Sequence, residues 1–417
     1  MMRILLFYIW LALCAQVHAG MSQQAYVWQR DWTSRLKLAI ASEASDLNGL
    51  TVLYGEYYPS RGIGFYPARI DYPTLKASGT PVTLALRLNW DSSVGVQASF
   101  ESGFSSWVRR AVRQAREEGG LELAAVEIDF DCPTSKLELY AEQLLKLRED
   151  LDGLPLSITT LPTWMTRPEA FRKLVEATDH FVLQVHSIQR AERFESDVSL
   201  CHAGRALLWT KQAAAFGKPY HLALPTYGYR LAYDLSGNLV EVAAEDASPI
   251  ENPAWRYRVI RAEPGEMAEL VRKLKLQRPD NCLGIIWYRL PIGGERLNWD
   301  PLTWRSVMQG KAATGGWKVL ANDKQDGAIE IELIQQSSVA IRPPAQVLVG
   351  WSGATAVAWD GQRNYTVRDR PGQGLALEWP KLQEAPLLPK ETRWTIGWLR
   401  LDTPAKLHLS LLPYVHE

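Results

Sequence analysis

Short apolar stretches alternate with helical repeats along the first three quarters of the chain. Each stretch is rich in β-branched or other apolar residues and is bounded by Gly, Pro or polar residues, which is typical of a β-strand. We predict eight such strands, at residues 25–32, 50–58, 81–89, 123–131, 154–161, 180–187, 220–227 and 282–290.

The segments between these strands carry apolar residues at helical spacing. Residues 104–118 place apolar side chains on one helical face and end before Gly119. Residues 135–151 begin with Ser135 and Glu138, the spacing of a capping box. Further helices are predicted at 167–177, 203–216 and 264–276.

This alternation predicts a parallel sheet with crossover helices, because parallel strands need long connections. Eight repeats favour closure into a (β/α)8 TIM-like barrel over residues 20–310. No Gly-x-Gly-x-x-Gly motif follows the first strand, which argues against a dinucleotide-binding fold. The predicted class is therefore α/β.

The pattern changes to period two after a Gly-rich segment at 311–316, which we interpret as a linker. Residues 317–417 predict a small all-β sandwich, with strands at 328–333, 345–351, 355–359, 393–401 and 406–411. Its tryptophans have two interpretations, a carbohydrate-binding face or core plus a docking surface, and we favour the second. They are Trp317, Trp351, Trp359, Trp379, Trp394 and Trp398.

Charge and the N-terminus narrow the function. The chain has 46 basic and 46 acidic residues. It therefore lacks the excess of positive charge that is typical of nucleic-acid-binding proteins. Residues 1–19 have the features of a signal peptide with cleavage after Ala19, which predicts a periplasmic or secreted protein with no integral membrane segment in the mature chain. The oxidising compartment allows a disulfide, for which we expect Cys132 and Cys201; the alternative is that the cysteines are small buried apolar residues.

The fourth predicted strand carries the main candidate chemistry. Side chains alternate along a strand, so Glu127, Asp129 and Asp131 share a face that we expect to point into the barrel. Crowded carboxyls raise at least one pKa and so provide a proton donor near neutral pH, as glycosidic bond cleavage requires. The alternative is a structural ion-pair cluster neutralised by Arg87 and Arg289.

This spacing resembles the Asp-x-Asp-x-Glu motif of chitinase-like glycoside hydrolases, with Glu and Asp exchanged at the first and last positions. The resemblance implies that Asp131 is the proton donor and that Asp129 assists the acetamido group of the substrate. It extends to residues 224–230 and to Trp287, which it implies stacks on sugar. The barrel, with the motif Ile-Asp-Phe-Asp-Cys-Pro at 128–133 and Trp287, also resembles the bacterial family called domain of unknown function 3142, which implies a glycosidase-type barrel and no known activity.

Further substrate-binding candidates lie at or near the ends of other strands, where barrel active sites form. They are Trp28, Glu56, Tyr58, Arg87, Asn89, Gln184, His186, Tyr227, Trp287 and Arg289. Glu56 and Asp131 are a candidate carboxylate pair. A metal site from His186, His202, Asp129 and Asp131 lacks any motif spacing, so we expect neither a metal nor a cofactor.

Three functions remain open at this stage. The first is a hydrolase acting on a polysaccharide or cell-wall glycan, with Asp131 as general acid. The second is a barrel that binds carbohydrate without catalysis, which the exchange of Glu for Asp at the donor position motivates. The third is a scaffold protein of the cell envelope that uses the Trp-rich C-terminal domain as its contact surface.

Overall fold

The structure, a computed structural model, is described for residues 20–60, 64–186, 191–196, 198–243, 252, 254–295, 297–311, 316–372, 374–380 and 385–412. Within these ranges the chain forms two compact units. One comprises the described residues within 1–186, 205–224 and 275–290, and the other comprises those within 187–204, 225–274 and 291–417.

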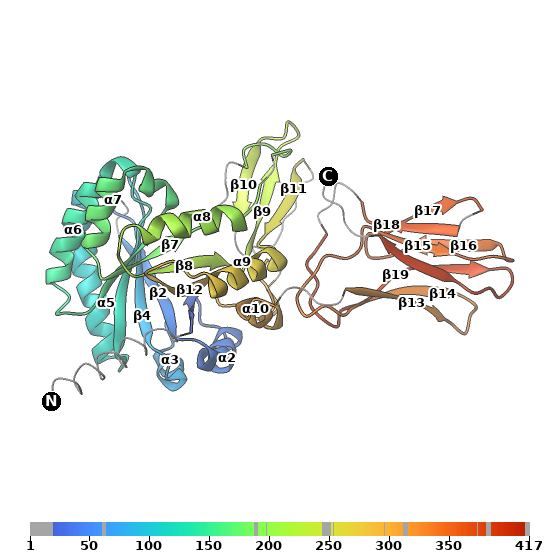
Figure 1. The fold of residues 1–417 in the computed structure, drawn as a ribbon, viewed down its shortest axis with the longest axis horizontal. Helices are drawn as coiled ribbons and strands as arrows, with labels where there is room; N and C mark the ends of the chain where they lie inside the picture. Colours follow the sequence, from blue (N-terminus) through green and yellow to red (C-terminus); the bar gives the residue numbers. More distant parts are fainter. Residues whose placement is uncertain are drawn as a thin grey trace, which may run out of the picture. The chain divides into compact units, whose positions relative to one another are not determined.

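Eight parallel strands close into a barrel (Figure 1). Neighbouring strands pair in the order β1-β12-β8-β7-β6-β5-β4-β2, and pairing of β1 with β2 closes the ring. The strands are β1 (Ser22–Val27), β2 (Gly49–Tyr57), β4 (Val82–Leu88), β5 (Leu123–Asp129), β6 (Leu156–Thr160), β7 (His180–Gln184), β8 (Tyr220–Pro225) and β12 (Cys282–Tyr288). The predicted (β/α)8 TIM-like barrel is confirmed.

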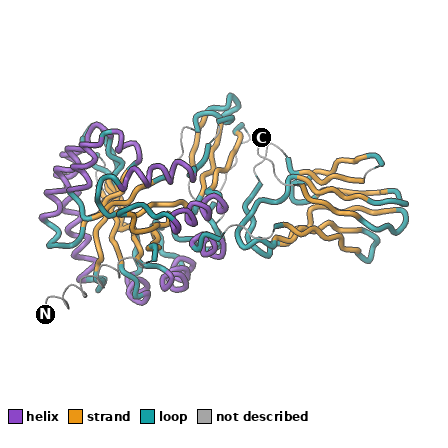
Figure 2. The backbone as a smooth tube through the Cα atoms, viewed as in Figure 1, coloured by secondary structure: helices purple, strands orange, loops and turns teal. Residues whose placement is uncertain are grey.

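Helices follow the barrel strands along the chain, in purple in Figure 2. Those in predicted segments are α5 (Ser105–Glu117), α6 (Leu137–Glu149), α7 (Pro168–Glu176), α8 (Ala203–Ala214) and α9 (Pro264–Leu276). The sequence pattern missed α2 (Ser34–Glu43), α3 (Tyr72–Ser78), the short α4 (Val96–Ser99) and α10 (Pro301–Met308). It also missed β3 (Phe65–Pro67), which pairs antiparallel with β2 as a hairpin.

The predicted capping box at Ser135 is wrong. Thr134–Lys136 form a 3-10 turn, and α6 begins at Leu137 with no side-chain cap on Lys136. Ser135 therefore lies inside a helical turn, whereas an N-cap residue needs an extended conformation for its hydroxyl to reach the third amide. The apolar face of α6 forms as predicted, with Tyr140, Leu144 and Leu147 buried.

A three-stranded antiparallel sheet, with strand order β10-β9-β11, is inserted between β8 and α9. Its strands are β9 (Gly228–Tyr233), β10 (Leu239–Ala243) and β11 (Arg256–Arg261). We had assigned this stretch no structure of its own, so the insertion is a finding of the structure alone.

The C-terminal part is a β-sandwich, as predicted. One sheet has the order β13-β14-β19-β16 and the other β17-β18-β15-β20, all antiparallel. The strands are β13 (Trp317–Asp323), β14 (Ile329–Gln335), β15 (Gln346–Gly350), β16 (Ala356–Gly361), β17 (Thr366–Arg370), β18 (Gly374–Glu378), β19 (Arg393–Leu401) and β20 (His408–Leu412). Ile331, Val347 and Ile396 lie in the shared core. Trp379 is buried there, Trp317, Trp351 and Trp394 pack against it, and Trp359 is 37% exposed.

Some predictions lie outside the described residues. The signal peptide at 1–19 does so entirely, and the linker at 311–316 does so except at its two ends. The boundaries 20–310 and 317–417 stay predictions. Among the described residues, no helix combines the length and apolar composition that crossing a bilayer requires.

Candidate active site

Strand β5 presents its acids as its alternation predicted. Val126 and Ile128 are fully buried in the apolar layer, while Glu127 and Asp129, on the other face, are each 1% exposed. Asp131 comes two residues after the end of β5, and 48% of its side chain is exposed. Two of the three carboxyls are therefore buried to the same extent, and Asp131 is the accessible one.

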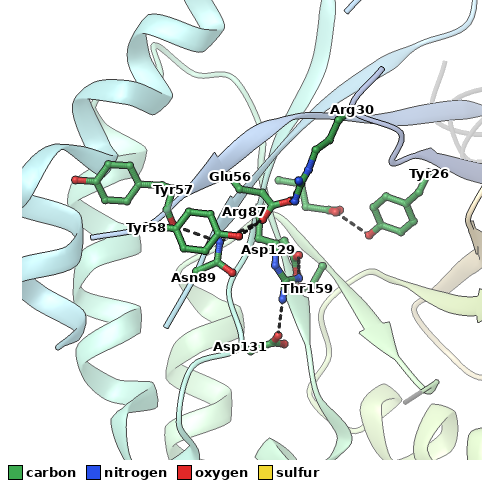
Figure 3. Close-up of polar contacts among 11 residues, drawn as sticks. Tyr26, Arg30, Glu56, Tyr57, Tyr58, Arg87, Asn89, Asp129, Asp131 and Thr159 are labelled. Atoms are coloured by element: carbon green, nitrogen blue, oxygen red, sulfur yellow. Dashed lines mark hydrogen bonds and ion pairs between the residues drawn. The ribbon is translucent and has the colours of Figure 1, made fainter. Parts of the chain in front are cut away.

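Arg87 of β4 joins Asp129 to Asp131 (Figure 3). Its Nη1 donates to Asp129 Oδ2 at 2.5 Å, and its Nη2 donates to Asp131 Oδ2 at 3.0 Å. The hydroxyl of Thr159 on β6 donates to Asp129 Oδ1 at 2.7 Å. The negative charge of Asp129, followed by that of Asp131, raises the pKa of Arg87 despite its burial. Asp129 is thus fixed in place, with both oxygens engaged.

Asp131 has the properties of a proton donor. Loss of solvation and the charge of Asp129 raise the pKa of its carboxyl, and Arg87 opposes them only in part. Because the side chain is half exposed, a ligand at the carboxyl ends of the barrel strands has access to it. Asp131 therefore keeps its proton to a higher pH than an ordinary aspartate and remains within reach of substrate.

Glu127 lies deeper. Burial raises the pKa of its carboxyl to about 8, and the charge of Asp129 acts in the same direction. Hydrogen bonds from Tyr26 and Ser157 lower this pKa and offset part of the rise. The Tyr26 hydroxyl donates to Glu127 Oε1 at 2.7 Å, and Ser157 lies 3.5 Å from Oε2. Glu127 is 1% exposed and is a neutral acid below about pH 8, so it forms part of the buried interior of the barrel next to Asp129.

A second cluster surrounds Glu56 of β2, as Figure 3 shows. Glu56 Oε1 accepts from Arg30 Nη2 at 2.5 Å, and Oε2 accepts from the Tyr58 hydroxyl at 2.7 Å and from Asn89 Nδ2 at 3.5 Å. Burial favours the neutral acid, but the hydrogen bonds from Tyr58 and Arg30 outweigh it and lower the pKa. Glu56 is an anion paired with Arg30. The structure thus brings together the predicted residues Glu56, Tyr58 and Asn89.

Aromatic rings gather at the ends of β1 and β12. Trp28 packs against Tyr26 and Tyr288, with centroid distances of 5.5 and 5.4 Å. The His186 ring, just after β7, stacks on Tyr288 at 5.4 Å, and burial lowers the pKa of this histidine to about 4. His186 is therefore neutral at physiological pH. Gln184, at the end of β7, and Arg289, after β12, are both half-buried.

Trp287 is placed differently from the expectation. Trp287 has no exposed surface and donates from Nε1 to Gln23 Oε1 at 2.7 Å, while its neighbours Ile286 and Tyr288 belong to the barrel interior. Because side chains alternate along a strand, the Trp287 indole faces the outer side of the barrel wall and is core rather than a sugar platform. Tyr227, in the other compact unit, is 6% exposed, and its hydroxyl lies 3.1 Å from that of Tyr229.

Sequence reasoning missed Trp90. It follows Asn89 two residues after the end of β4 and is 37% exposed, and its ring centroid lies 6.2 Å from that of Phe130, the residue before Asp131 in the sequence. The signal that would have found it is a tryptophan immediately after a strand that already carried two candidates, Arg87 and Asn89.

The three cysteines within the described residues are free thiols. Cys132, Cys201 and Cys282 are buried, and Cys132 Sγ contacts the carbonyl of Pro133 at 3.6 Å. The predicted Cys132–Cys201 disulfide is not formed in this structure, and the alternative of small buried apolar residues describes these side chains. Within the described ranges, no group of three or more His, Cys, Asp or Glu side chains is arranged to hold a metal ion.

Comparison with known proteins agrees with the barrel. The sequence model of the family described as "Domain of unknown function (DUF3142)" matches residues 79–293. The spore cortex-lytic enzyme SleL of Bacillus cereus superposes with a TM-score of 0.50 at 12% identity, covering 71% of this chain and 76% of that one. A chitinase of Chromobacterium violaceum gives a TM-score of 0.48 at 13% identity, covering 70% of this chain and 99% of that one. No curated protein matches the sequence. The likeness to SleL concerns the fold alone, and it agrees with the closed parallel β/α barrel.

Proposed function

The chain belongs to the family described as "Domain of unknown function (DUF3142)", and because that description assigns no activity, we propose its function from the candidate site. The protein is an exported glycoside hydrolase that acts on a polysaccharide or cell-wall glycan, with Asp131 as the general acid. Export rests on the signal-peptide pattern of residues 1–19.

The observation that carries this proposal is the state of Asp131. Its carboxyl is half exposed, lies just beyond β5, and has a raised pKa because of desolvation and the charge of Asp129. A general acid must hold a proton at the working pH and must reach the glycosidic oxygen. Among the three acids on this segment, only Asp131 meets both requirements.

Asp129 and Trp90 have separate roles in the proposed site. Asp129 is fixed by Arg87 and Thr159, and its charge beside Asp131 contributes to the raised pKa of the Asp131 carboxyl. The resemblance to chitinase-like enzymes further assigns Asp129 to orienting an acetamido group on the substrate. Trp90, exposed beside Phe130, offers an aromatic face for a sugar ring.

In the reaction the proton of Asp131 passes to the glycosidic oxygen as the bond to the anomeric carbon breaks. Positive charge then develops on the sugar ring. The carboxylates of Asp129 on β5 and Glu56 on β2, the two strands that flank β4, supply negative charge, and each is held by an arginine. The leaving sugar departs as a neutral alcohol because it has taken the proton. Water then adds through its oxygen to the anomeric carbon and gives one proton to the Asp131 carboxylate, which restores the acid.

One observation favours a second function, carbohydrate binding without turnover. Arg87 donates to Asp131 as well as to Asp129, and a guanidinium on a carboxylate stabilises its ionised form. An ionised Asp131 would bind sugar hydroxyls but would not donate a proton. The envelope scaffold remains a third hypothesis, which rests on the C-terminal tryptophans alone.

Product release distinguishes these functions. The mature protein is incubated with a panel of bacterial and plant polysaccharides, and the products are followed by mass spectrometry beside Asp131→Asn. We expect the wild type to release oligosaccharides and Asp131→Asn to lose about 100-fold or more of the rate.

A matched control is Asp150→Asn, which removes the same charge from an exposed ion pair with Arg109. This variant should retain the wild-type rate. Glycan binding with no product from the folded wild type would favour the binding function over hydrolysis. Equal product release by the wild type and Asp131→Asn would refute the assignment of Asp131.

A further inference from the structure

A cavity of about 360 Å³ lies on the outer side of the barrel wall, away from the candidate site. It is bounded by the β2–β3 hairpin, by the segment that leads into α3, and by α5. Helices α3 and α5 are labelled in Figure 1. No residue of the candidate site lines it. Its walls include Tyr54, Phe65, Tyr72, Trp107 and Gln114. This volume falls within the range of small-ligand sites.

The walls of the cavity are aromatic. Phe65 stacks on Trp107 with a centroid distance of 5.8 Å and an interplanar angle of 20°, and Tyr54 lies 5.6 Å from the same indole. Trp107 and Tyr54 are buried and hold the wall rigid, while Phe65 and Tyr72 are only half-buried. The partly open rings give a flat apolar surface of the kind on which a sugar ring packs.

The charge of the lining is positive. Arg69 and Arg110 line the cavity, and no Asp or Glu does. The Arg110 guanidinium sits 4.9 Å from the centroid of the Phe65 ring. A cation–π contact uses the face of a guanidinium and none of its five N–H donors. Arg69 is 87% exposed and has Asp31 at 3.8 Å, a long and solvated ion pair.

Neutral polar groups complete the cavity. The Tyr54 hydroxyl donates to Gln114 Oε1 at 2.5 Å, and Gln114 Nε2 donates to Glu118 outside the lining at 3.0 Å. Burial, together with Tyr54 and Glu118, raises the pKa of Tyr72 to about 12, so its phenol stays protonated. Phenol oxygens accept hydrogen bonds from hydroxyls, which suits a polyhydroxylated ring better than a purely aromatic acid.

We propose that this cavity is a second saccharide-binding site, which takes an acidic sugar with a ring carboxylate, a uronic acid. Its carboxylate pairs with Arg110 and Arg69, and its ring lies against Phe65 and Tyr72. A guanidinium binds a carboxylate through two parallel hydrogen bonds, which selects the acidic sugar over its neutral counterpart. The site holds a glycan at a surface that takes no part in bond cleavage.

Calorimetric titration of the mature protein with digalacturonic acid tests the site. We expect Arg110→Gln to weaken binding about tenfold or more, because it removes a charge-assisted hydrogen bond. Arg69→Gln should also weaken binding, for the same reason. The control is Arg109→Gln, which removes the same charge from the same helix but from an ion pair with Asp150. It should change affinity less than twofold. Neutral digalactose should bind at least tenfold more weakly than the acidic disaccharide.

The titration is repeated on Asp131→Asn, so that failure of this site and failure of the proposed hydrolase are separable. Unchanged affinity in that variant supports a site apart from the catalytic one. Equal weakening by Arg109→Gln and Arg110→Gln, loss of binding in Asp131→Asn, or no binding by the wild type at millimolar concentration would each overturn the proposal.

Discussion

At the scale of single residues, one strand segment places three carboxyls in three electrostatic environments. Glu127 is buried and protonated, Asp129 is buried and held by Arg87 and Thr159, and Asp131 is half exposed with a raised pKa. Pairing and burial set these differences, since Glu127 and Asp129 are each 1% exposed but the ion pair with Arg87 is made by Asp129, and Asp131 alone of the three is half exposed. Division of this kind separates a proton donor from the charges that support it.

Glu127 gives a prediction about stability. Its pKa of about 8 in the folded protein lies above its ordinary value of 4.5, so the folded state keeps a proton that the unfolded chain releases. The stability of the wild type should therefore fall as the pH rises from about 4.5 to about 8, by up to about 1.4 kcal/mol per pH unit from this group. Glu127→Gln, which mimics the neutral acid, should lose this dependence.

Urea unfolding at pH 5 and pH 8 measures the effect. The free-energy advantage of Glu127→Gln over the wild type should be larger at pH 8 than at pH 5. Asp150→Asn, which removes an exposed carboxylate in place of a buried one, serves as the comparison. An equal difference between Glu127→Gln and the wild type at both pH values would show that Glu127 is ionised in the folded protein.

At the scale of elements, the hydrophobic pattern predicted what is regular. All eight barrel strands and five helices were found, because a buried strand is a short apolar run and a buried helix face repeats every three or four residues. Helix α3 has seven residues, of which only Leu75 is buried, and α2 leaves Leu38 69% exposed, so neither carries a strong periodicity. The inserted strand β10 has mostly exposed side chains and gives no alternation.

The candidate site, like the secondary structure, could be predicted only where polar and apolar residues alternate. In β5, acids alternate with apolar residues, so the side facing the barrel was readable. In β12, apolar residues lie on both faces, and nothing in the sequence says whether Ile286 or Trp287 points inward. The ion pairs of Arg87 and Arg30 join separate elements, so only the folded chain reveals them.

Closure of the barrel depends on Gly284 in β12. A Cβ at this position would lie 2.0 Å from the Ser22 carbonyl oxygen of β1. Gly284→Ala must therefore displace the β1–β12 pairing, and we expect it to destabilise the protein by about 1–3 kcal/mol in urea unfolding. Gly265→Ala is the control, because nothing lies within 4 Å of its added Cβ. Equal stability of the two variants would contradict the strand register at this seam.

At the scale of the whole molecule, the chain forms two compact units, and the sandwich has a core of its own. Ile396 has no exposed surface and lies in that core. We expect Ile396→Ala to remove about 2–5 kcal/mol of stability and to reduce amide protection mainly in β14, β15, β18 and β19. Hydrogen exchange followed by mass spectrometry measures this.

The barrel provides the comparison for that experiment. Ile158→Ala removes a fully buried residue of β6, and its effect should appear in the barrel strands. Equal loss of protection in both units from either substitution would mean that the two cores unfold together as one cooperative structure.

The role of Asp131 as general acid is the central claim, and its dependence on the leaving group tests it most directly. The kcat/KM of the wild type and Asp131→Asn is compared on glycosides that the wild type cleaves, with either a sugar or dinitrophenol as leaving group. A sugar must be protonated as it departs, whereas dinitrophenolate needs no proton. Asp131→Asn should lose about 100-fold or more with the sugar leaving group and little with dinitrophenol. An equal loss with both would contradict Asp131 as the proton donor.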